Sequence, residues 1–292
     1  MPRVKFADLE LEYDTFGDPA DPPMVLVMGL GAQMTTWDEG FCGLFAAQGF
    51  HVIRYDNRDV GLSTWLDDLP LPDLAALLSG DTSTAPYLIA DLAADLIGLL
   101  DALGIDRAHV VGASMGGMIV QQAAIDHPER LLSLCSIMST TGDPSVGQGR
   151  PEVIATLAQP SPPTREGIIE QRLASSRLTR SPGFDVDEDV ARRRIEASHD
   201  RSHRPLASPR HLAAVLASPD RTPGLRGVTL PTLVVHGAAD PLIGVSGGEA
   251  TAAAVPDAEL LVVDGMGHDL PEQVWPTIVE AVTRNAKRAE QT

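Results

Sequence analysis

Residues 109–118, HVVGASMGGM, carry the strongest structural signal in the chain. A short run of β-branched residues ends in the pattern Gly-x-Ser-x-Gly and passes directly into an apolar segment of helical length. This pattern predicts a tight turn from a buried strand into a helix, with Ser114 at its apex.

The residues around Ser114 favour a nucleophile at this turn. Gly112 and Gly116 leave room for the strand and helix to pass closely, which holds the serine in a strained backbone conformation. The serine hydroxyl then faces solvent, and the N–H of Met115 points at an oxyanion that forms beside it. The alternative is a glycine-rich strand–helix crossing with an incidental serine.

Composition limits the classes of protein to consider. The 292 residues are typical of one α/β domain with an insertion, and the N-terminal residues contain no apolar signal region. No stretch approaches the ~20 apolar residues of a membrane span. The net charge of −18 disfavours nucleic acid and anionic lipid as partners. We therefore expect a soluble, cytoplasmic protein that acts on a small neutral molecule. Assembly into a homo-oligomer is left open.

Neither cysteine has the spacing of a metal ligand or a redox pair. Cys42 and Cys135 are isolated in apolar surroundings. We therefore expect two buried free thiols.

Residues 1–142 form the first part of the expected core. Alternation over 4–16 predicts two short antiparallel strands, and four apolar runs predict buried parallel strands. These runs are 24–28, 51–56, 109–113 and 131–138, and helices are expected at 41–49 and 88–103.

Two loops of this first part bear on chemistry. The loop Gly29-Leu30-Gly31 leaves a central strand, so the N–H of Leu30 is the expected second oxyanion donor beside Met115. Asp56 ends the next predicted strand, and we expect it to cap the following turn rather than act as a catalytic acid.

Residues 143–222 differ from the rest of the chain in apolar pattern and in charge. This segment contains no strand-like apolar run. Between Asp143 and Arg221 there are twelve arginines and eleven acidic residues, a net charge of +1, so the remainder of the chain carries about −19. This favours a helical cap inserted between two sheet strands and lying over the active site. Its arginines either dock it on the acidic core or form a solvated surface.

Residues 223–292 return to core-like sequence. The runs 232–236 and 259–264 predict two further parallel strands, and 272–287 predicts a closing helix. Asp240 follows the first strand and His268 follows the second, at the carboxyl ends where ligands bind in parallel α/β sheets.

Ser114, Asp240 and His268 therefore occur in the order nucleophile, acid, histidine. His268 has room to reach the serine and take its proton, while Asp240 holds the histidine tautomer. Asp264 and Asp269 are too close to His268 along the chain to be preferred. The remaining histidines are expected to be structural or exposed, although a cap histidine that touches substrate stays open: His51, His109, His127, His199, His203, His211 and His236.

Taken together, these segments resemble the α/β-hydrolase superfamily over essentially the whole chain. The resemblance rests on residues 28–31, 56–63, the Ser114 turn, Asp240 and Gly267-His268. Residues 27–29, 52–56 and 265–268 are similar to the aclacinomycin methylesterases, which tailor polyketides in actinobacteria, and to related carboxylesterases and lipases. Met28 stands where the family commonly has histidine, and Asp59 stands where glycine is usual after Arg58.

The resemblance implies a mostly parallel central sheet flanked by helices, with a helical cap insertion. It implies that Ser114, Asp240 and His268 catalyse ester hydrolysis through an acyl-enzyme, that Leu30 and Met115 form the oxyanion hole, and that no metal or organic cofactor is needed. Serine at the turn disfavours epoxide hydrolases and haloalkane dehalogenases, which carry aspartate there. Thioesterase, lactonase, C–C hydrolase and perhydrolase activities stay open, and a hydrolase-like ligand receptor is the alternative from another class.

The pocket walls are expected to be apolar. They include Leu30, Met115, Met34 and Trp37 from the core, and Phe184 or Leu212 from the cap. Such walls favour an apolar acyl or alcohol portion in the substrate.

Overall fold

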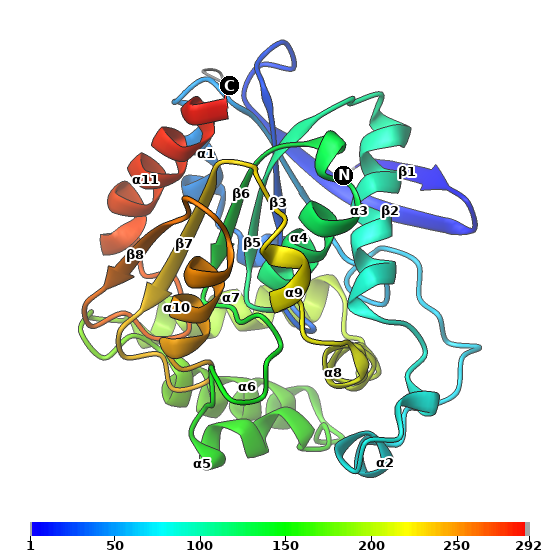
Figure 1. Ribbon diagram of the computed structural model, residues 1–292. Coiled ribbons are helices and arrows are strands. Elements are labelled where there is room, and N and C mark those ends of the chain that lie inside the picture. Colours follow the sequence, from blue (N-terminus) through cyan, green and yellow to red (C-terminus); the bar gives the residue numbers. More distant parts are fainter. Residues whose placement is uncertain (1, 290–292) are drawn as a thin grey trace.

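The computed structural model describes residues 2–289, in which eight strands form one sheet in the order β1-β2-β4-β3-β5-β6-β7-β8 (Figure 1). Strands β1 (Arg3–Phe6) and β2 (Leu9–Phe16) are antiparallel at one edge, and the other six are mutually parallel. These six are β3 (Pro23–Val27), β4 (His51–Tyr55), β5 (Ala108–Ala113), β6 (Leu131–Ile137), β7 (Thr232–Gly237) and β8 (Glu259–Val263). The mostly parallel sheet confirms the predicted fold class.

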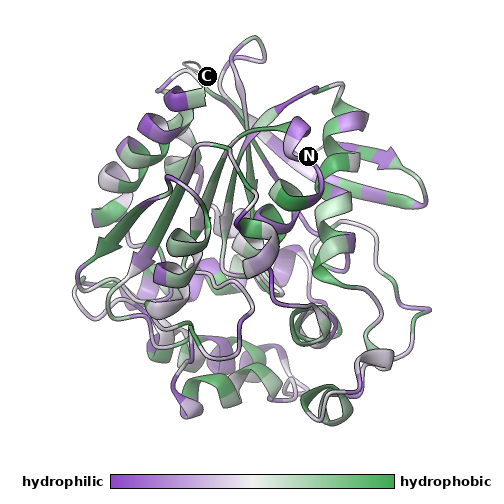
Figure 2. Ribbon diagram, in the orientation of Figure 1, coloured by the Kyte–Doolittle hydropathy of each residue, from purple (hydrophilic) through white to green (hydrophobic). Residues whose placement is uncertain are grey.

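Helices cover both faces of the sheet, and each face has its own apolar core. One face is covered by α1 (Glu39–Ala46) and α11 (Trp275–Arg288). The other is covered by α3 (Ile89–Leu103), α4 (Met115–Asp126), α9 (Thr222–Leu225) and α10 (Ser246–Ala254). Figure 2 shows apolar residues concentrated on the central strands, while α11 carries alternating polar and apolar stripes. Two-sided burial explains why the central strands are continuous apolar runs.

The strand-to-helix turn at Ser114 is formed as predicted. Strand β5 ends at Ala113, α4 begins at Met115, and Ser114 between them has φ 57° and ψ −121°. A Cβ on Gly112 would lie 2.1 Å from the Gly116 carbonyl oxygen, and one on Gly116 would lie 2.1 Å from the Val27 carbonyl oxygen. Only glycine therefore allows β3, β5 and α4 to approach this closely.

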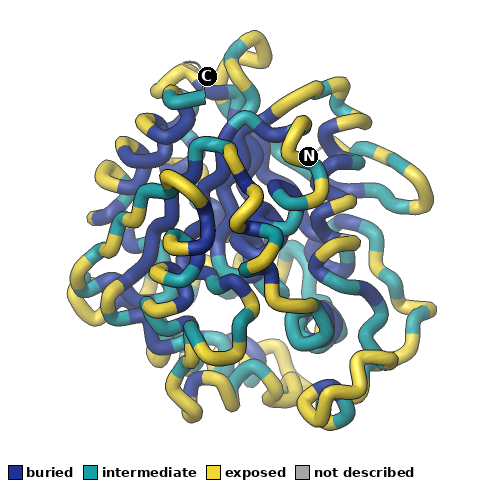
Figure 3. Tube along the Cα trace, in the orientation of Figure 1, coloured by how far each residue is buried: buried dark blue, intermediate teal, exposed yellow. Residues whose placement is uncertain are grey.

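Residues 138–231, all of them described, contain helices and loops but no strand. The longer helices are α6 (Arg165–Thr179), α7 (Glu188–Arg201) and α8 (Ala207–Ala217), with the short α5 (Pro151–Ile154) before them. They lie together beyond the carboxyl ends of the parallel strands, beside the short α2 (Leu74–Leu78) (Figure 1). Figure 3 shows that this region is more exposed than the sheet and its flanking helices.

The two cysteines are free and buried, as expected. Burial raises the pKa of the Cys42 thiol to about 12 and also raises the pKa of Cys135, so both stay protonated at neutral pH. Among residues 2–289, no helix combines the length and apolar character needed to span a bilayer.

The close passage at Gly116 predicts the effect of adding one methyl group. We expect Gly116→Ala to lower the free energy of unfolding by about 3 kcal/mol, because its Cβ meets the backbone of Val27, which cannot rotate away. Urea denaturation measures this. Gly43→Ala in α1 is the matched control, since its Cβ meets no atom within 4 Å; we expect it to gain about 0.5 kcal/mol from helix propensity. Equal stabilities for Gly116→Ala and the wild type would contradict the argument.

Candidate active site

Three side chains from separate loops meet at the carboxyl edge of the sheet. His268 Nε2 lies 2.9 Å from Ser114 Oγ, and His268 Nδ1 lies 2.7 Å from Asp240 Oδ2. Ser114 comes from the β5–α4 turn, Asp240 follows β7 and His268 follows β8. The structure thus brings together the three residues that the sequence singled out.

The environment of Asp240 fixes the orientation of His268. The Asp240 side chain is fully buried, and its Oδ1 accepts hydrogen bonds from the N–H groups of Leu242 and Ile243, both at 2.9 Å. An ionised carboxylate only accepts hydrogen bonds, so in the contact between His268 Nδ1 and Asp240 Oδ2 the hydrogen is carried by His268 Nδ1. The lone pair of a neutral His268 is then on Nε2, where it accepts from the Ser114 hydroxyl.

The loop around His268 is also held by residues of the helical segment. The N–H of His268 donates to the Thr179 carbonyl at the end of α6, at 2.7 Å. Asp269 accepts from the N–H and the hydroxyl of Ser181, and the Ser181 Oγ accepts from the N–H of Gly267 at 2.8 Å. Asp269 is therefore engaged with Ser181, which leaves Asp240 as the carboxylate that contacts His268.

The loop 29–31 lies directly against Ser114. A Cβ on Gly29 would be 3.0 Å from the Ser114 Cβ. Met115 is the first residue of α4, where N–H groups lack a helical acceptor. That Leu30 and Met115 donate to an oxyanion stays a prediction.

His211, which the sequence placed in the cap as a structural or exposed histidine with substrate contact left open, contacts this same loop. Its Nδ1 accepts from the N–H of Gly31 and its Nε2 donates to the Arg58 carbonyl, both at 3.0 Å. The side chain is fully buried, and burial lowers its pKa to about 4, so the ring is neutral. Gly31 has φ 64°, and a Cβ there would lie 2.2 Å from Ser208 Oγ. Helix α8 therefore packs on the loop beside Ser114. No local pattern could reveal a contact across 180 residues.

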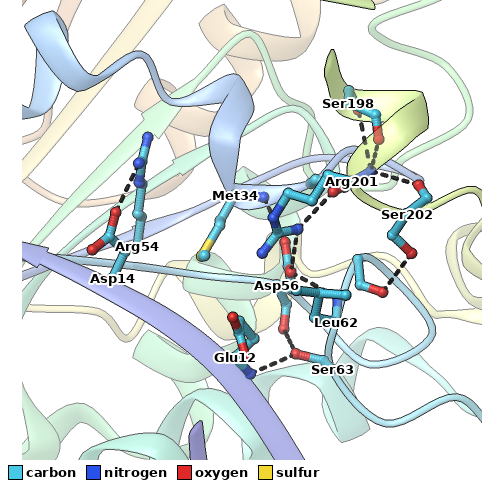
Figure 4. Close-up of polar contacts among 12 residues, drawn as sticks. Glu12, Asp14, Met34, Arg54, Asp56, Leu62, Ser63, Ser198, Arg201 and Ser202 are labelled. Carbon is cyan, nitrogen blue, oxygen red and sulfur yellow. Dashed lines mark hydrogen bonds and ion pairs between the residues drawn. The ribbon is translucent and has the colours of Figure 1, made fainter. Parts of the chain in front are cut away.

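Asp56 caps the turn after β4, as the sequence predicts, and it also binds α7. Its Oδ1 accepts from the N–H of Met34 at 2.8 Å, and its Oδ2 accepts from the N–H of Leu62 at 3.0 Å. Arg201 Nη1 lies 2.7 Å from the same Oδ2 (Figure 4). Burial raises the pKa of Asp56, while Arg201 and the two amides act in the opposite direction.

Gln33 binds the carboxyl end of α7. Its Nε2 donates to the carbonyls of Ser198 and Ser202 at 2.6 and 2.7 Å, and its Oε1 accepts from Arg201 at 2.6 Å. Further arginines of this segment pair with acids outside it, as the docking hypothesis expects: Arg194 with Asp38 and Glu272, Arg204 with Asp67, and Arg210 with Asp59.

The contacts of Asp59 explain why aspartate stands at a position where the family usually has glycine. Its φ is 67°, a conformation that favours glycine, yet its buried side chain has three partners. Oδ1 accepts from the Leu66 N–H at 2.7 Å and from Arg210 at 3.0 Å, and Oδ2 accepts from the Tyr87 hydroxyl at 2.8 Å. These contacts offset the backbone strain and join α8 to the core.

The predicted pocket residues lie in different settings. Met34 and Trp37 are fully buried, and the Trp37 ring stacks on Phe41 with centroids 5.7 Å apart, within the apolar core. Trp37 thus packs in the core under α1. Phe184 and Leu212 belong to the helical segment and are partly buried.

No group of three or more His, Cys, Asp or Glu side chains among residues 2–289 is arranged to hold a metal ion.

Comparison with known proteins agrees with this fold. The family model described as alpha/beta hydrolase fold matches residues 22–273. The rhodomycin D methylesterase DnrP of Streptomyces peucetius is 30% identical, over 97% of this chain and 96% of its own length. The 3-oxoadipate enol-lactonase 2 of Acinetobacter baylyi is 28% identical over 83% of this chain and 80% of its own. A crystal structure described as a putative aryl esterase from Burkholderia cenocepacia superposes with TM-score 0.78 at 17% identity, covering 100% of this chain and 99% of its own.

The buried pair of Arg210 and Asp59 predicts a non-additive stability effect. We expect Arg210→Met to lower the free energy of unfolding by about 3 kcal/mol, because it leaves the Asp59 carboxylate buried without its cation. Adding Asp59→Gly removes that charge and relieves the positive φ, so the double variant regains about 1–2 kcal/mol. Urea denaturation measures both, with the exposed Arg193→Met as control. Additive losses would show that the pair is not coupled.

The neutral state of His211 predicts a pH dependence of stability. The unfolded chain binds a proton on this ring near pH 6.5, whereas the folded protein binds it only near pH 4. The free energy of unfolding therefore decreases as the pH falls from about 6.5 to about 4, and His211 does not change it above this interval. His211→Gln can keep both hydrogen bonds without titrating. We expect the wild type to lose about 2 kcal/mol more than this variant between pH 7 and about pH 5, measured by urea unfolding. Parallel pH profiles would overturn the assignment.

Proposed function

The chain belongs to the α/β-hydrolase fold family and is an ester hydrolase, and from this premise we propose that Ser114, His268 and Asp240 form its catalytic triad. The observation that carries the proposal is the unbroken chain of hydrogen bonds from Asp240 through His268 to Ser114. The strained turn at Ser114 supports it as well, because such strain has an energetic cost that persists mainly at functional sites.

Acylation begins with proton transfer. His268 Nε2 accepts the Ser114 proton as Oγ attacks the ester carbonyl, and Asp240 stabilises the imidazolium that results. The N–H groups of Leu30 and Met115 stabilise the tetrahedral oxyanion. The imidazolium then protonates the leaving alcohol, which departs and leaves an acyl-serine.

Deacylation repeats these steps with water. His268 takes a proton from the water as it attacks the acyl-serine, and returns that proton to Ser114 Oγ when the acid leaves. Bond making and breaking need only the triad, the two amides and water, so the reaction needs neither a metal nor an organic cofactor.

The helical segment 143–222 acts as the cap of this site. Its support comes from the contacts of Thr179 with His268 and of His211 with the loop 29–31. The substrate we propose is a small-to-medium ester with an apolar portion, and a methyl ester of a polyketide-like compound is the favoured case because of the methylesterase relative. Lactone hydrolysis by the same triad is the second candidate, supported by the enol-lactonase relative.

The proposal predicts which variants lose activity. We expect the wild type to hydrolyse a p-nitrophenyl ester series from acetate to palmitate, and Ser114→Ala to lose roughly a thousandfold or more in kcat/KM. Asp240→Asn should also lose activity severely, because an amide that donates to His268 Nδ1 forces the proton onto Nε2. Asp264→Asn, an exposed acid near the same loop, is the matched control and should retain activity.

Two results would contradict this assignment. Retained hydrolysis in Ser114→Ala would remove the serine from the mechanism. Absence of turnover in the wild type with every ester and lactone tested, together with ligand binding, would favour a receptor.

A further inference from the structure

The loop that contains Leu30 is a four-residue turn, residues 29–32. The N–H of Ala32 donates to the Gly29 carbonyl at 3.3 Å and closes the turn. Gly31, its third residue, has φ 64°, whereas Leu30 before it does not have a positive φ. This combination is that of a type II turn, in which the peptide between the two central residues is flipped relative to the commoner type I turn. The orientation of this one peptide therefore decides the shape of the loop.

The turn leaves the N–H of Leu30 without a partner. In a trans peptide the N–H points opposite to the C=O, and the Gly29 carbonyl is directed at Ala32, so the N–H of Leu30 is directed away from the turn. Among residues 2–289 it has no acceptor. Gly29 lies against Ser114, because a Cβ on Gly29 would be 3.0 Å from the Ser114 Cβ and 3.4 Å from its Oγ. A free donor thus lies near the proposed nucleophile as long as the turn keeps its shape.

One side chain of the helical segment holds the flipped peptide in place. The N–H of this peptide belongs to Gly31, and it donates to His211 Nδ1 at 3.0 Å. On the opposite side of the ring, His211 Nε2 lies 3.0 Å from the Arg58 carbonyl oxygen. A backbone N–H only donates and a carbonyl only accepts, so the ring carries its lone pair on Nδ1 and its hydrogen on Nε2. If the peptide flipped, its carbonyl would face that lone pair, and the ring therefore excludes the other turn.

The surroundings fix both the imidazole ring and the turn. The ring is fully buried, and the Tyr87 ring meets it edge to face with centroids 6.2 Å apart. Ser208, on the same helix α8, lies so close to the turn that a Cβ on Gly31 would be 2.2 Å from its Oγ. On the core side, Asn57 Nδ2 donates to the Met28 carbonyl at 2.9 Å, just before the turn. The turn is thus held between the core and α8.

We propose that His211 is a positioning residue for the oxyanion hole: by accepting from Gly31, it keeps the N–H of Leu30 directed at the oxyanion that forms on attack by Ser114. The inference rests on the proposed function and adds to it a residue that touches no reacting atom. Because His211 belongs to α8, the oxyanion hole is complete only when this helix lies on the turn. The helical segment thus contributes to the chemical step besides covering the site.

The test removes the acceptor without emptying its space. His211→Leu fills most of the volume of the imidazole but offers no acceptor to Gly31. We expect kcat/KM for the best p-nitrophenyl ester of the acetate-to-palmitate series to fall about 50-fold, somewhat less than the loss of a whole oxyanion donor, with the change mainly in kcat. His211→Gln, whose amide can accept from Gly31 and donate to Arg58, should restore kcat/KM to within about fivefold of the wild type.

Arg210→Met is the matched control for damage to α8. Arg210 precedes His211 and joins the same helix to Asp59 and to the Leu69 carbonyl, both at 3.0 Å, but among residues 2–289 it has no hydrogen bond with the turn 29–32. We expect this variant to be less stable to urea while its kcat/KM stays within about threefold of the wild type. A loss of activity as large as that of His211→Leu would trace the effect to loosening of α8 and overturn the role of His211.

A transition-state analogue measures the oxyanion hole without turnover. Butylboronic acid forms a tetrahedral adduct when Ser114 Oγ adds to boron and its proton passes to His268, and a boron-bound oxygen then occupies the oxyanion hole. We expect His211→Leu to raise the Kd of this adduct about 50-fold, in parallel with the fall in kcat/KM, and His211→Gln to reverse most of the change. A rise in KM alone, with kcat and the boronic acid Kd unchanged, would contradict the proposal.

The two measurements distinguish this inference from the proposed function. Serine-dependent hydrolysis that His211→Leu leaves within about threefold would refute the role of His211 and leave the proposed function in place. If the wild type hydrolyses no ester or lactone, the proposed function fails. The role of His211 is then supported only if butylboronic acid binds in a Ser114-dependent manner and His211→Leu weakens that binding, and it is refuted by any other result.

Discussion

The backbone of Ser114 is held at a positive φ by the close passage of β5 and α4, and the geometry of the carboxyl edge depends on that turn. Strain of this kind costs of order 1–3 kcal/mol and persists only where the surroundings over-determine it. Here the Ser114 N–H donates to the Ile137 carbonyl on β6, and Gly116 packs on the backbone of β3. Three central strands thus fix one hydroxyl, and the loops after β7 and β8 need only bring Asp240 and His268 to it.

Several ion pairs join the helical segment to this edge of the core. Buried pairs such as Arg201 with Asp56 and Arg210 with Asp59 contribute little net stability, because desolvation offsets their attraction. Removing one partner of such a pair lowers the free energy of unfolding strongly, however. Together these pairs therefore specify a single position of α7 and α8 on the core. His211 extends the same contact surface to the loop beside Ser114 with a neutral ring. The position of the segment and the shape of the site are therefore set by the same contacts.

The sequence predicted what is encoded locally and missed what depends on distant partners. Continuous apolar runs located the parallel strands because both faces of the sheet are buried, and glycine spacing located the turn at Ser114. His211 could not be assigned, because its partners lie far away along the chain. Trp37 was expected in the pocket on its apolar character, but an apolar ring packs equally well against Phe41 in the core. The short α2 was missed because five residues give no usable periodicity.

The order of the strands along the chain has a consequence for biosynthesis. Ser114 precedes its partner His268 by 154 residues, and the strand that delivers the histidine is the last one added to the sheet. At translation rates of about 5–20 residues per second, roughly 8 to 30 seconds separate the emergence of the two. Throughout that time Ser114 lacks the residue that the proposed mechanism assigns to it as a base. Under the proposed mechanism, a nascent chain therefore carries an unreactive serine until His268 has emerged and β8 has joined the sheet.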